Sequence, residues 1–147
     1  MTTDDAVMTF LRYLRHRGLH VTSARERVAR VACGLDGHFD AGDLWAKLRS
    51  DRSSTAPATV YRTLHLMVEA GVLRRLDFDE GAQYEVVIGR PRHEHLVCEQ
   101  CGRVLEFRDP DLDARLAEAG EGLGFQPHRH QLMVWGRCAE CQGSDLR

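Results

Sequence analysis

Apolar residues recur at three- and four-residue spacing through the first half of the chain. In residues 5–17, Val7, Phe10, Leu11 and Leu14 fall on one side of a helix, and Gly18 follows as a stop. The same spacing predicts three further helices, from Thr22 or Ser23 to about Cys33, over residues 41–49, and from about Ala58 to Ala70. A turn-rich stretch, residues 50–57, separates the last two.

After Gly71, which suits the position just past a helix end, the pattern changes to that of extended chain. Residues 72–78 and 82–88 are predicted to form two strands, and Asp79-Glu80-Gly81 between them forms a hairpin turn. Helices that pack together, a last one entered from a turn, and then a hairpin: this order is typical of a winged helix-turn-helix.

The second half of the chain predicts a different arrangement. Residues 89–92 indicate a hinge, and strands are expected over residues 95–98, 104–107 and 131–138, with a helix over residues 111–119. The predicted fold class is therefore α+β. A winged helix-turn-helix domain, residues 1–88, is followed by the hinge, residues 89–92, and by a small α/β domain, residues 93–147.

Composition is that of an ordinary folded protein, with 43% apolar and 29% charged residues. No apolar run approaches the ~18 residues of a membrane span, and the acidic N-terminus has no features of a secretory signal. We therefore expect a cytoplasmic protein with no membrane partner. In a reducing compartment, its five cysteines are better interpreted as metal ligands or thiols than as disulfides.

Charge is distributed unevenly. The net charge is only −2, yet six arginines and a single acid, Glu26, lie between Arg12 and Arg30. Because attraction to phosphate depends on local charge density, this stretch is compatible with nucleic-acid binding. A solvated basic helix face explains it equally well.

Four cysteines form two knuckles, Cys98-x-x-Cys101 and Cys138-x-x-Cys141, with 36 residues between them. Four thiolates suit tetrahedral Zn²⁺ and leave no open position for catalysis, which predicts a structural zinc site. A redox-active dithiol pair and unrelated thiols are the alternatives. Cys33 lies in an apolar helical run and is interpreted as a core residue.

A second group combines histidine and carboxylate. In an extended segment, His93 and His95 point the same way and can share an ion, whereas Glu94 faces opposite. Nitrogen and oxygen donors without sulfur suit Fe²⁺, Mn²⁺, Co²⁺, Ni²⁺ or Zn²⁺, and they bind more reversibly than thiolates. Exposed histidines in a loop are the alternative interpretation.

The last helix of the first domain has two faces. Its apolar face is expected to pack on the core, while Ala58, Tyr61, Arg62 and His65 share the other. Arginine reads guanine or contacts phosphate, and tyrosine contacts a thymine methyl or a phosphate. Thr59 and Thr63 are expected to add phosphate contacts. Alone, this pattern is that of an ordinary amphipathic helix, but within the predicted winged helix-turn-helix it is interpreted as a DNA recognition helix.

Three segments, Ala58–Leu64, His93–Gly102 and Gly136–Cys141, together resemble the ferric uptake regulator family of metal-dependent repressors. The resemblance runs from about Leu11 to Cys141. It implies a homodimer with an N-terminal DNA-binding domain and a C-terminal dimerisation domain. A regulatory metal would set the spacing of the two DNA-reading heads on a pseudo-palindromic operator in double-stranded DNA.

Site residues follow from the same resemblance. It implies a regulatory metal site at His38, Glu85, His93, His95 and Glu106, and structural zinc at the four knuckle cysteines. A further metal site would use Glu94, Asp113 and His130, although Arg92 stands where the family usually has a histidine. The expected DNA-binding residues are Thr59, Tyr61, Arg62 and His65 of the recognition helix, together with Arg25, where the resemblance keeps a basic residue.

The identity of Glu85 bears on the regulatory metal. Zinc-sensing branches of the family tend to have a cysteine near this position, and peroxide-sensing branches an aspartate. The glutamate is most similar to the iron-sensing branch, so Fe²⁺ is expected as corepressor, with Mn²⁺ as the alternative and Zn²⁺ able to substitute. Peroxide-, manganese- and zinc-sensing regulators therefore remain open.

A zinc-dependent deaminase is the alternative from another class, since its signature combines His-x-Glu with Pro-Cys-x-x-Cys. Here Val97 replaces the proline, and a second cysteine knuckle closes the site. The sequence thus predicts a regulator and not an enzyme.

Overall fold

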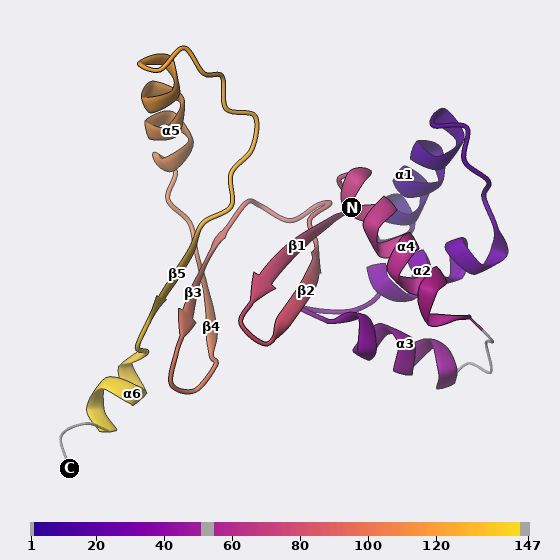
Figure 1. Ribbon diagram of the computed structural model, residues 1–147, viewed down its shortest axis with the longest axis horizontal. Coiled ribbons are helices and arrows are strands. Elements are labelled where there is room, and N and C mark those ends of the chain that lie inside the picture. Colours follow the sequence, from indigo (N-terminus) through magenta and orange to yellow (C-terminus); the bar gives the residue numbers. More distant parts are fainter. Residues whose placement is uncertain (1, 51–54, 145–147) are drawn as a thin grey trace. The chain divides into compact units, whose positions relative to one another are not determined.

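The computed structural model describes residues 2–50 and 55–144, and the chain forms two compact units (Figure 1). Unit 1 spans Met1–Pro91 and unit 2 spans Arg92–Arg147. Their boundary falls inside the segment expected to be a hinge, residues 89–92. Of the expected turn-rich stretch, residues 51–54 lie outside the described residues.

Unit 1 begins with four helices: α1 (Thr3–His16), α2 (Ser23–Cys33), α3 (Ala41–Ser50) and α4 (Pro57–Glu69). Local signals fix several of their ends. The Thr2 hydroxyl and the Asp5 carboxylate form a capping box at the start of α1. The Thr22 hydroxyl accepts from the backbone N–H of Arg25 at the start of α2 (3.2 Å).

The core of unit 1 is apolar. α1 buries Val7, Phe10, Leu11 and Leu14, as its spacing predicts, and α2, α3 and α4 add their own apolar faces to the same cluster. Gly71 ends α4 with a positive φ of 71°. Its N–H donates to the Val68 carbonyl, and the N–H of Val72 donates to that of Met67 (both 3.0 Å), which is a Schellman motif.

A hairpin completes unit 1. β1 (Leu73–Phe78) pairs antiparallel with β2 (Gly81–Val86), and an isolated bridge joins Phe39, ahead of α3, to Tyr84 in β2. The sequence did not indicate this bridge. The bridge connects the segment between α2 and α3 to the hairpin of β1 and β2.

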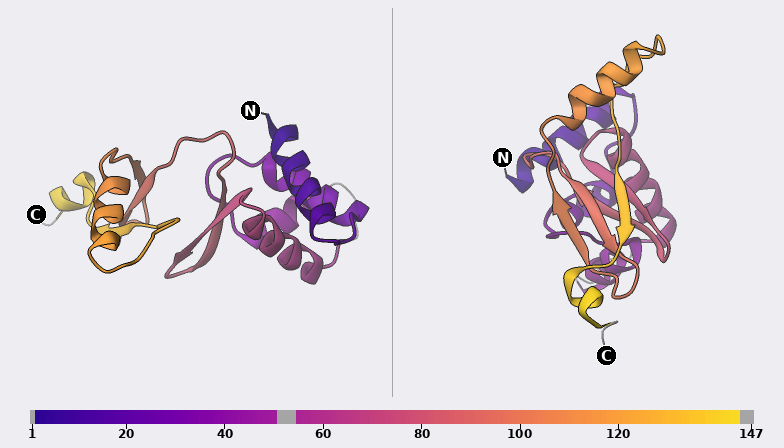
Figure 2. Two further views of the ribbon diagram at one scale, coloured as in Figure 1. Left: turned by 90° about the horizontal axis from the view of Figure 1, so that it is seen from above. Right: turned by 90° about the vertical axis from the view of Figure 1, so that its left-hand side faces the viewer.

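Unit 2 contains a three-stranded sheet in the order β4-β3-β5 (Figure 2). β3 (Glu94–Cys98) pairs antiparallel with β4 (Val104–Phe107) and parallel with β5 (Met133–Gly136). Between β4 and β5, α5 (Leu112–Glu121) lies beyond the end of the sheet at which β3 begins (Figures 1 and 2). A short helix, α6 (Ala139–Ser144), follows β5.

The structure confirms the α+β class and the winged-helix order of elements in unit 1. Unit 2 differs from the prediction in two respects. The last strand is shorter than residues 131–138, and α6 was not predicted. In the described part of the chain, no helix is both long and apolar enough to span a bilayer.

Candidate metal centres and nucleic-acid face

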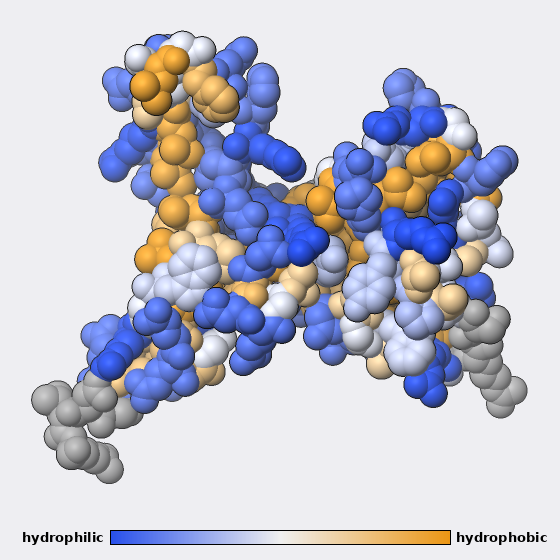
Figure 3. Space-filling model, in the orientation of Figure 1, coloured by the Kyte–Doolittle hydropathy of each residue, from blue (hydrophilic) through white to orange (hydrophobic). Residues whose placement is uncertain are grey.

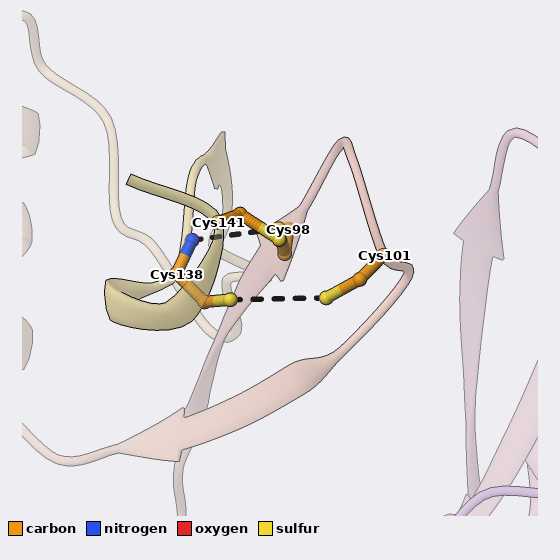
Figure 4. A group of neighbouring side chains, drawn as sticks. All are labelled: Cys98, Cys101, Cys138 and Cys141. Carbon is orange, nitrogen blue, oxygen red and sulfur yellow. Dashed lines mark hydrogen bonds between the residues drawn. The ribbon is translucent and has the colours of Figure 1, made fainter. Parts of the chain in front are cut away.

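The four knuckle cysteines converge at one end of the sheet in unit 2 (Figure 4). Cys98 closes β3, Cys101 follows in the turn to β4, and Cys138 and Cys141 flank the start of α6. The four sulfurs lie within 4.8 Å of one another, and those of Cys101 and Cys138 are 3.7 Å apart. Tetrahedral Zn²⁺ with bonds near 2.3 Å requires sulfurs about 3.8 Å apart, so the four side chains fit the ion.

Hydrogen bonds already favour one thiolate in this group. The backbone N–H of Cys138 donates to the Cys98 sulfur (3.4 Å), and this donor, followed by the N–H of Cys101, lowers the pKa of Cys98 to about 6. Cys141 is affected oppositely. Its hydrogen bond with Cys138, and then burial, raise its pKa to about 12, because the thiol is the favoured donor to a neighbouring sulfur.

An ion pair joins the two knuckles. Arg103, which follows the first knuckle, donates from both terminal nitrogens to the two carboxylate oxygens of Glu140 (each 2.8 Å). Glu140 lies in α6 between Cys138 and Cys141. This paired geometry is the strong form of an arginine–carboxylate contact. Neither residue could be predicted from the sequence, because the spacing of cysteines carries no signal about their neighbours.

In unit 1, the bridge between Phe39 and Tyr84 brings His38 opposite Glu85. His38 Nε2 lies 3.2 Å from the carboxylate of Glu85, whose side chain is fully buried. Arg74, on β1 across the hairpin from Glu85, lies 3.5 Å from the other oxygen. A buried carboxylate requires such partners, since leaving it without them costs several kcal/mol.

In unit 2, His93, His95 and Glu106 gather on one face of the sheet. His95 on β3 pairs with Glu106 on β4, and His93, two residues before His95, shares its side as the alternation predicts. The two imidazole rings are 5.0 Å apart between centroids, and His93 Nε2 lies 3.6 Å from Glu106. His93 and His95 are buried, whereas the Glu106 side chain is half exposed.

Glu94 faces the other way, as the alternation predicts, and contacts His130, which Asp113 approaches at its other ring nitrogen. Glu94 Oε1 lies 2.8 Å from His130 Nε2, and Asp113 Oδ1 lies 3.3 Å from His130 Nδ1. The guanidinium of Arg92 lies among the three. The residues that the resemblance implied for a further metal site are thus brought together, but around a side chain that is itself a cation.

The exposed face of α4 is that expected for nucleic-acid contact. Tyr61, Arg62 and His65 are exposed and Thr59 is partly so, while Val60, Leu64 and Met67 are buried. The expectation for Thr63 was wrong. Its side chain is fully buried and its hydroxyl donates to the Thr59 carbonyl (2.7 Å), so it has no access to phosphate.

Arg25 lies at the first turn of α2, in the basic stretch. Its guanidinium donates to the His20 carbonyl (2.6 Å) and remains partly exposed. Arg30, in the same stretch, forms ion pairs with Glu26 and Asp4 (each 3.0 Å). Part of the basic charge is therefore compensated within the fold.

Comparison with known proteins identifies the family. A family profile described as "Ferric uptake regulator family" matches residues 16–135. The ferric uptake regulation protein of Bordetella parapertussis is 35% identical over 131 residues, covering 88% of this chain and 94% of the relative.

Solved structures agree. The ferric uptake regulator of Pseudomonas aeruginosa, determined with manganese, is 30% identical with a TM-score of 0.73, covering 86% of this chain and 95% of the other. That of Helicobacter pylori, described as having three functional metal binding sites, shares the fold at a TM-score of 0.77 and 24% identity, covering 97% and 95%. The chain belongs to the ferric uptake regulator family of metal-responsive, DNA-binding transcription regulators.

Proposed function

We propose that this protein is an iron-responsive transcriptional repressor of the cytoplasm, in which an exchangeable metal ion acts as corepressor. The observation that carries the proposal is the chemistry of two ligand sets, one in each unit. Unit 1 offers His38 and Glu85, and unit 2 offers His93, His95 and Glu106. Neither set alone contains enough ligands to fill the coordination sphere of Fe²⁺ or Mn²⁺, and both use only nitrogen and oxygen.

One ion bound jointly by the two sets would link the DNA-reading unit to the other unit. Metal binding would then stabilise one arrangement of the units by up to the difference in metal affinity between arrangements. Fe²⁺ is proposed as the physiological ion on the identity of Glu85, with Mn²⁺ as the competing candidate. Zn²⁺ would bind the same donors, because imidazole and carboxylate do not exclude it.

The four cysteines are proposed to hold a structural zinc ion. When bound, this ion supplies stability and no reaction, since four thiolates close its coordination sphere. Nothing in the ligand chemistry calls for a catalytic role, and we propose that the protein is not an enzyme.

A homodimer is proposed through unit 2. Leu96 on β3 pairs with Leu105 on β4 and Val134 on β5, so the three form one row across the sheet. All three are exposed, and Figure 3 shows hydrophobic side chains on the surface of this unit. A symmetric dimer that covers this row would carry two α4 helices, as a pseudo-palindromic operator with half-sites about 34 Å apart requires.

The test is operator affinity as a function of metal. Duplexes selected from a random pool by the manganese-loaded protein would be titrated with and without Fe²⁺ or Mn²⁺, anaerobically, under a chelator too weak to remove the zinc. We expect binding only with metal, and loss of that response in His93→Ala but not in the control His128→Ala, whose side chain is exposed. Equal affinity with and without metal would reject the proposal. A +16 Da addition on His38 or His93 after peroxide treatment of the iron form would identify a peroxide sensor instead.

A further inference from the structure

Arg92, Glu94, Asp113 and His130 form a compact polar cluster where unit 2 begins, beside a hollow of about 230 Å³. The resemblance implied a third metal ion for three of these residues. We propose instead that the Arg92 guanidinium permanently takes the place of that ion, so that this chain binds two metal ions per subunit and joins α5 to the sheet without metal.

The contacts of the Arg92 guanidinium support this proposal. One terminal nitrogen donates to Asp113 Oδ1 (3.1 Å). The other donates to the His130 carbonyl (3.2 Å) and lies 3.0 Å from His130 Nδ1. Its Nε lies 3.9 Å from Glu94 Oε1. A single cation therefore contacts all three residues that would otherwise coordinate metal.

Both nitrogens of His130 are already engaged. Nε2 lies 2.8 Å from the Glu94 carboxylate. Nδ1 lies 3.0 Å from an Arg92 nitrogen and 3.3 Å from Asp113 Oδ1. A metal ion binds a ring nitrogen through its lone pair, and both nitrogens of His130 face these partners instead.

The carboxylates do not converge either. The near oxygens of Glu94 and Asp113 lie against opposite nitrogens of the His130 ring, so no one position is close to all three as placed. The second oxygen of Glu94 accepts from the backbone N–H of Leu132 (3.1 Å), which holds that carboxylate against the start of β5.

The cluster has a mechanical consequence for α5. This helix lies beyond the end of the sheet (Figures 1 and 2) and buries only Gly120 among its residues. Contacts between Asp113 in α5, Arg92 and His130 therefore help to attach the helix to the rest of unit 2. Because a guanidinium cannot lose its proton in a protein, the attachment is independent of metal supply.

Metal counting tests the proposal on the full-length dimer. Protein with its cysteine site filled by zinc would be dialysed to equilibrium against Co²⁺, and bound cobalt measured by elemental analysis in wild type, Arg92→His and Asp113→Asn. We expect Arg92→His to bind one more cobalt ion per subunit than wild type, and Asp113→Asn to bind the same number as wild type. These differences between variants do not depend on whether the proposed regulatory site binds cobalt. Failure of this proposal can therefore be told apart from failure of the proposed regulatory site.

Hydrogen exchange tests the proposal independently, in case one of the variants does not fold. In wild type, the hydrogen-exchange rate of α5 should not change when Co²⁺ is removed. In Arg92→Met, that rate should rise more than tenfold, while β3 remains protected. Loss of one cobalt ion from Asp113→Asn would overturn the proposal. So would an unchanged cobalt count in a folded Arg92→His, or metal-dependent protection of α5 in wild type.

Discussion

Removal of one cysteine ligand should unfold unit 2 and leave unit 1 folded. The substitution is Cys138→Ser. It removes a sulfur that lies 3.7 Å from that of Cys101 and leaves three thiolates to bind the ion. The expectation follows from an imbalance between the two cores. The buried apolar cluster of unit 1 has twenty residues, whereas that of unit 2, in the described chain, consists of Cys98, Cys138 and Cys141.

The magnitude follows from the same comparison. A buried leucine or phenylalanine contributes about 1.5–3 kcal/mol, and unit 2 buries none in its described residues. Structural zinc in small domains contributes about 10–16 kcal/mol of apparent binding free energy at pH 7. Since a whole domain is stable by only about 5–15 kcal/mol, loss of the ion exceeds what the remaining contacts of unit 2 supply.

Hydrogen exchange with mass spectrometry is the assay, at one protein concentration because dimerisation adds stability by mass action. Peptides from β3, β4 and β5 should lose protection in Cys138→Ser, while those from α1 to α4 keep theirs. The matched control is Leu64→Ala in α4, fully buried in unit 1. It should cost unit 1 about 2–5 kcal/mol without changing the zinc content. A variant that has lost its zinc and yet protects all three strands would refute the idea that the ion replaces an apolar core.

Three further outcomes are expected. Arg62→Ala should weaken operator binding by about 1–3 kcal/mol, measured by fluorescence anisotropy over a range of salt. Arg103→Met should speed the transfer of zinc from the protein to a chelator. The double variant Arg103→Glu with Glu140→Arg, which exchanges the two charges, should return the transfer rate towards that of wild type. Burial raises the pKa of Cys33 from 9.0 to about 11, so the neutral thiol stabilises the fold below pH 9 and this stability is lost as pH rises through 11. The denaturation midpoint of wild type should therefore fall more than that of Cys33→Ala over this range, and an equal fall would contradict the assignment.

Sequence patterns were sufficient for the helices of unit 1 because each has a periodic apolar face and a local end signal. Gly71 illustrates this, since the hydrogen bonds that end α4 are local and require only a residue that tolerates positive φ. Likewise, the alternation along β3 correctly placed His93 and His95 on one side and Glu94 on the other.

Non-local contacts could not be predicted in this way. The burial of Glu85 beside His38 depends on a bridge between Phe39 and Tyr84, residues far apart in the chain. α6 has six residues and no apolar period, and its sequence environment gave no sign of the ion pair between Glu140 and Arg103. Thr63 lies next to the exposed face of α4 by helical spacing, yet the packing of α4 on the core buries it.

The proposed zinc ion, the Arg92 guanidinium and the exchangeable metal ion have different roles in a metal sensor because their chemistry differs. A ligand that binds only the folded state at 100 times its dissociation constant stabilises it by about 2.7 kcal/mol, and that stability disappears when the ligand is withdrawn. A sensor that relied on its sensed metal for folding would therefore unfold under the starvation that it must report. On the proposals above, thiolate-bound zinc and the Arg92 guanidinium hold unit 2 together whatever the supply of exchangeable metal. Only the histidine and carboxylate ligands then respond to it, and the response is a change of arrangement, not of folding.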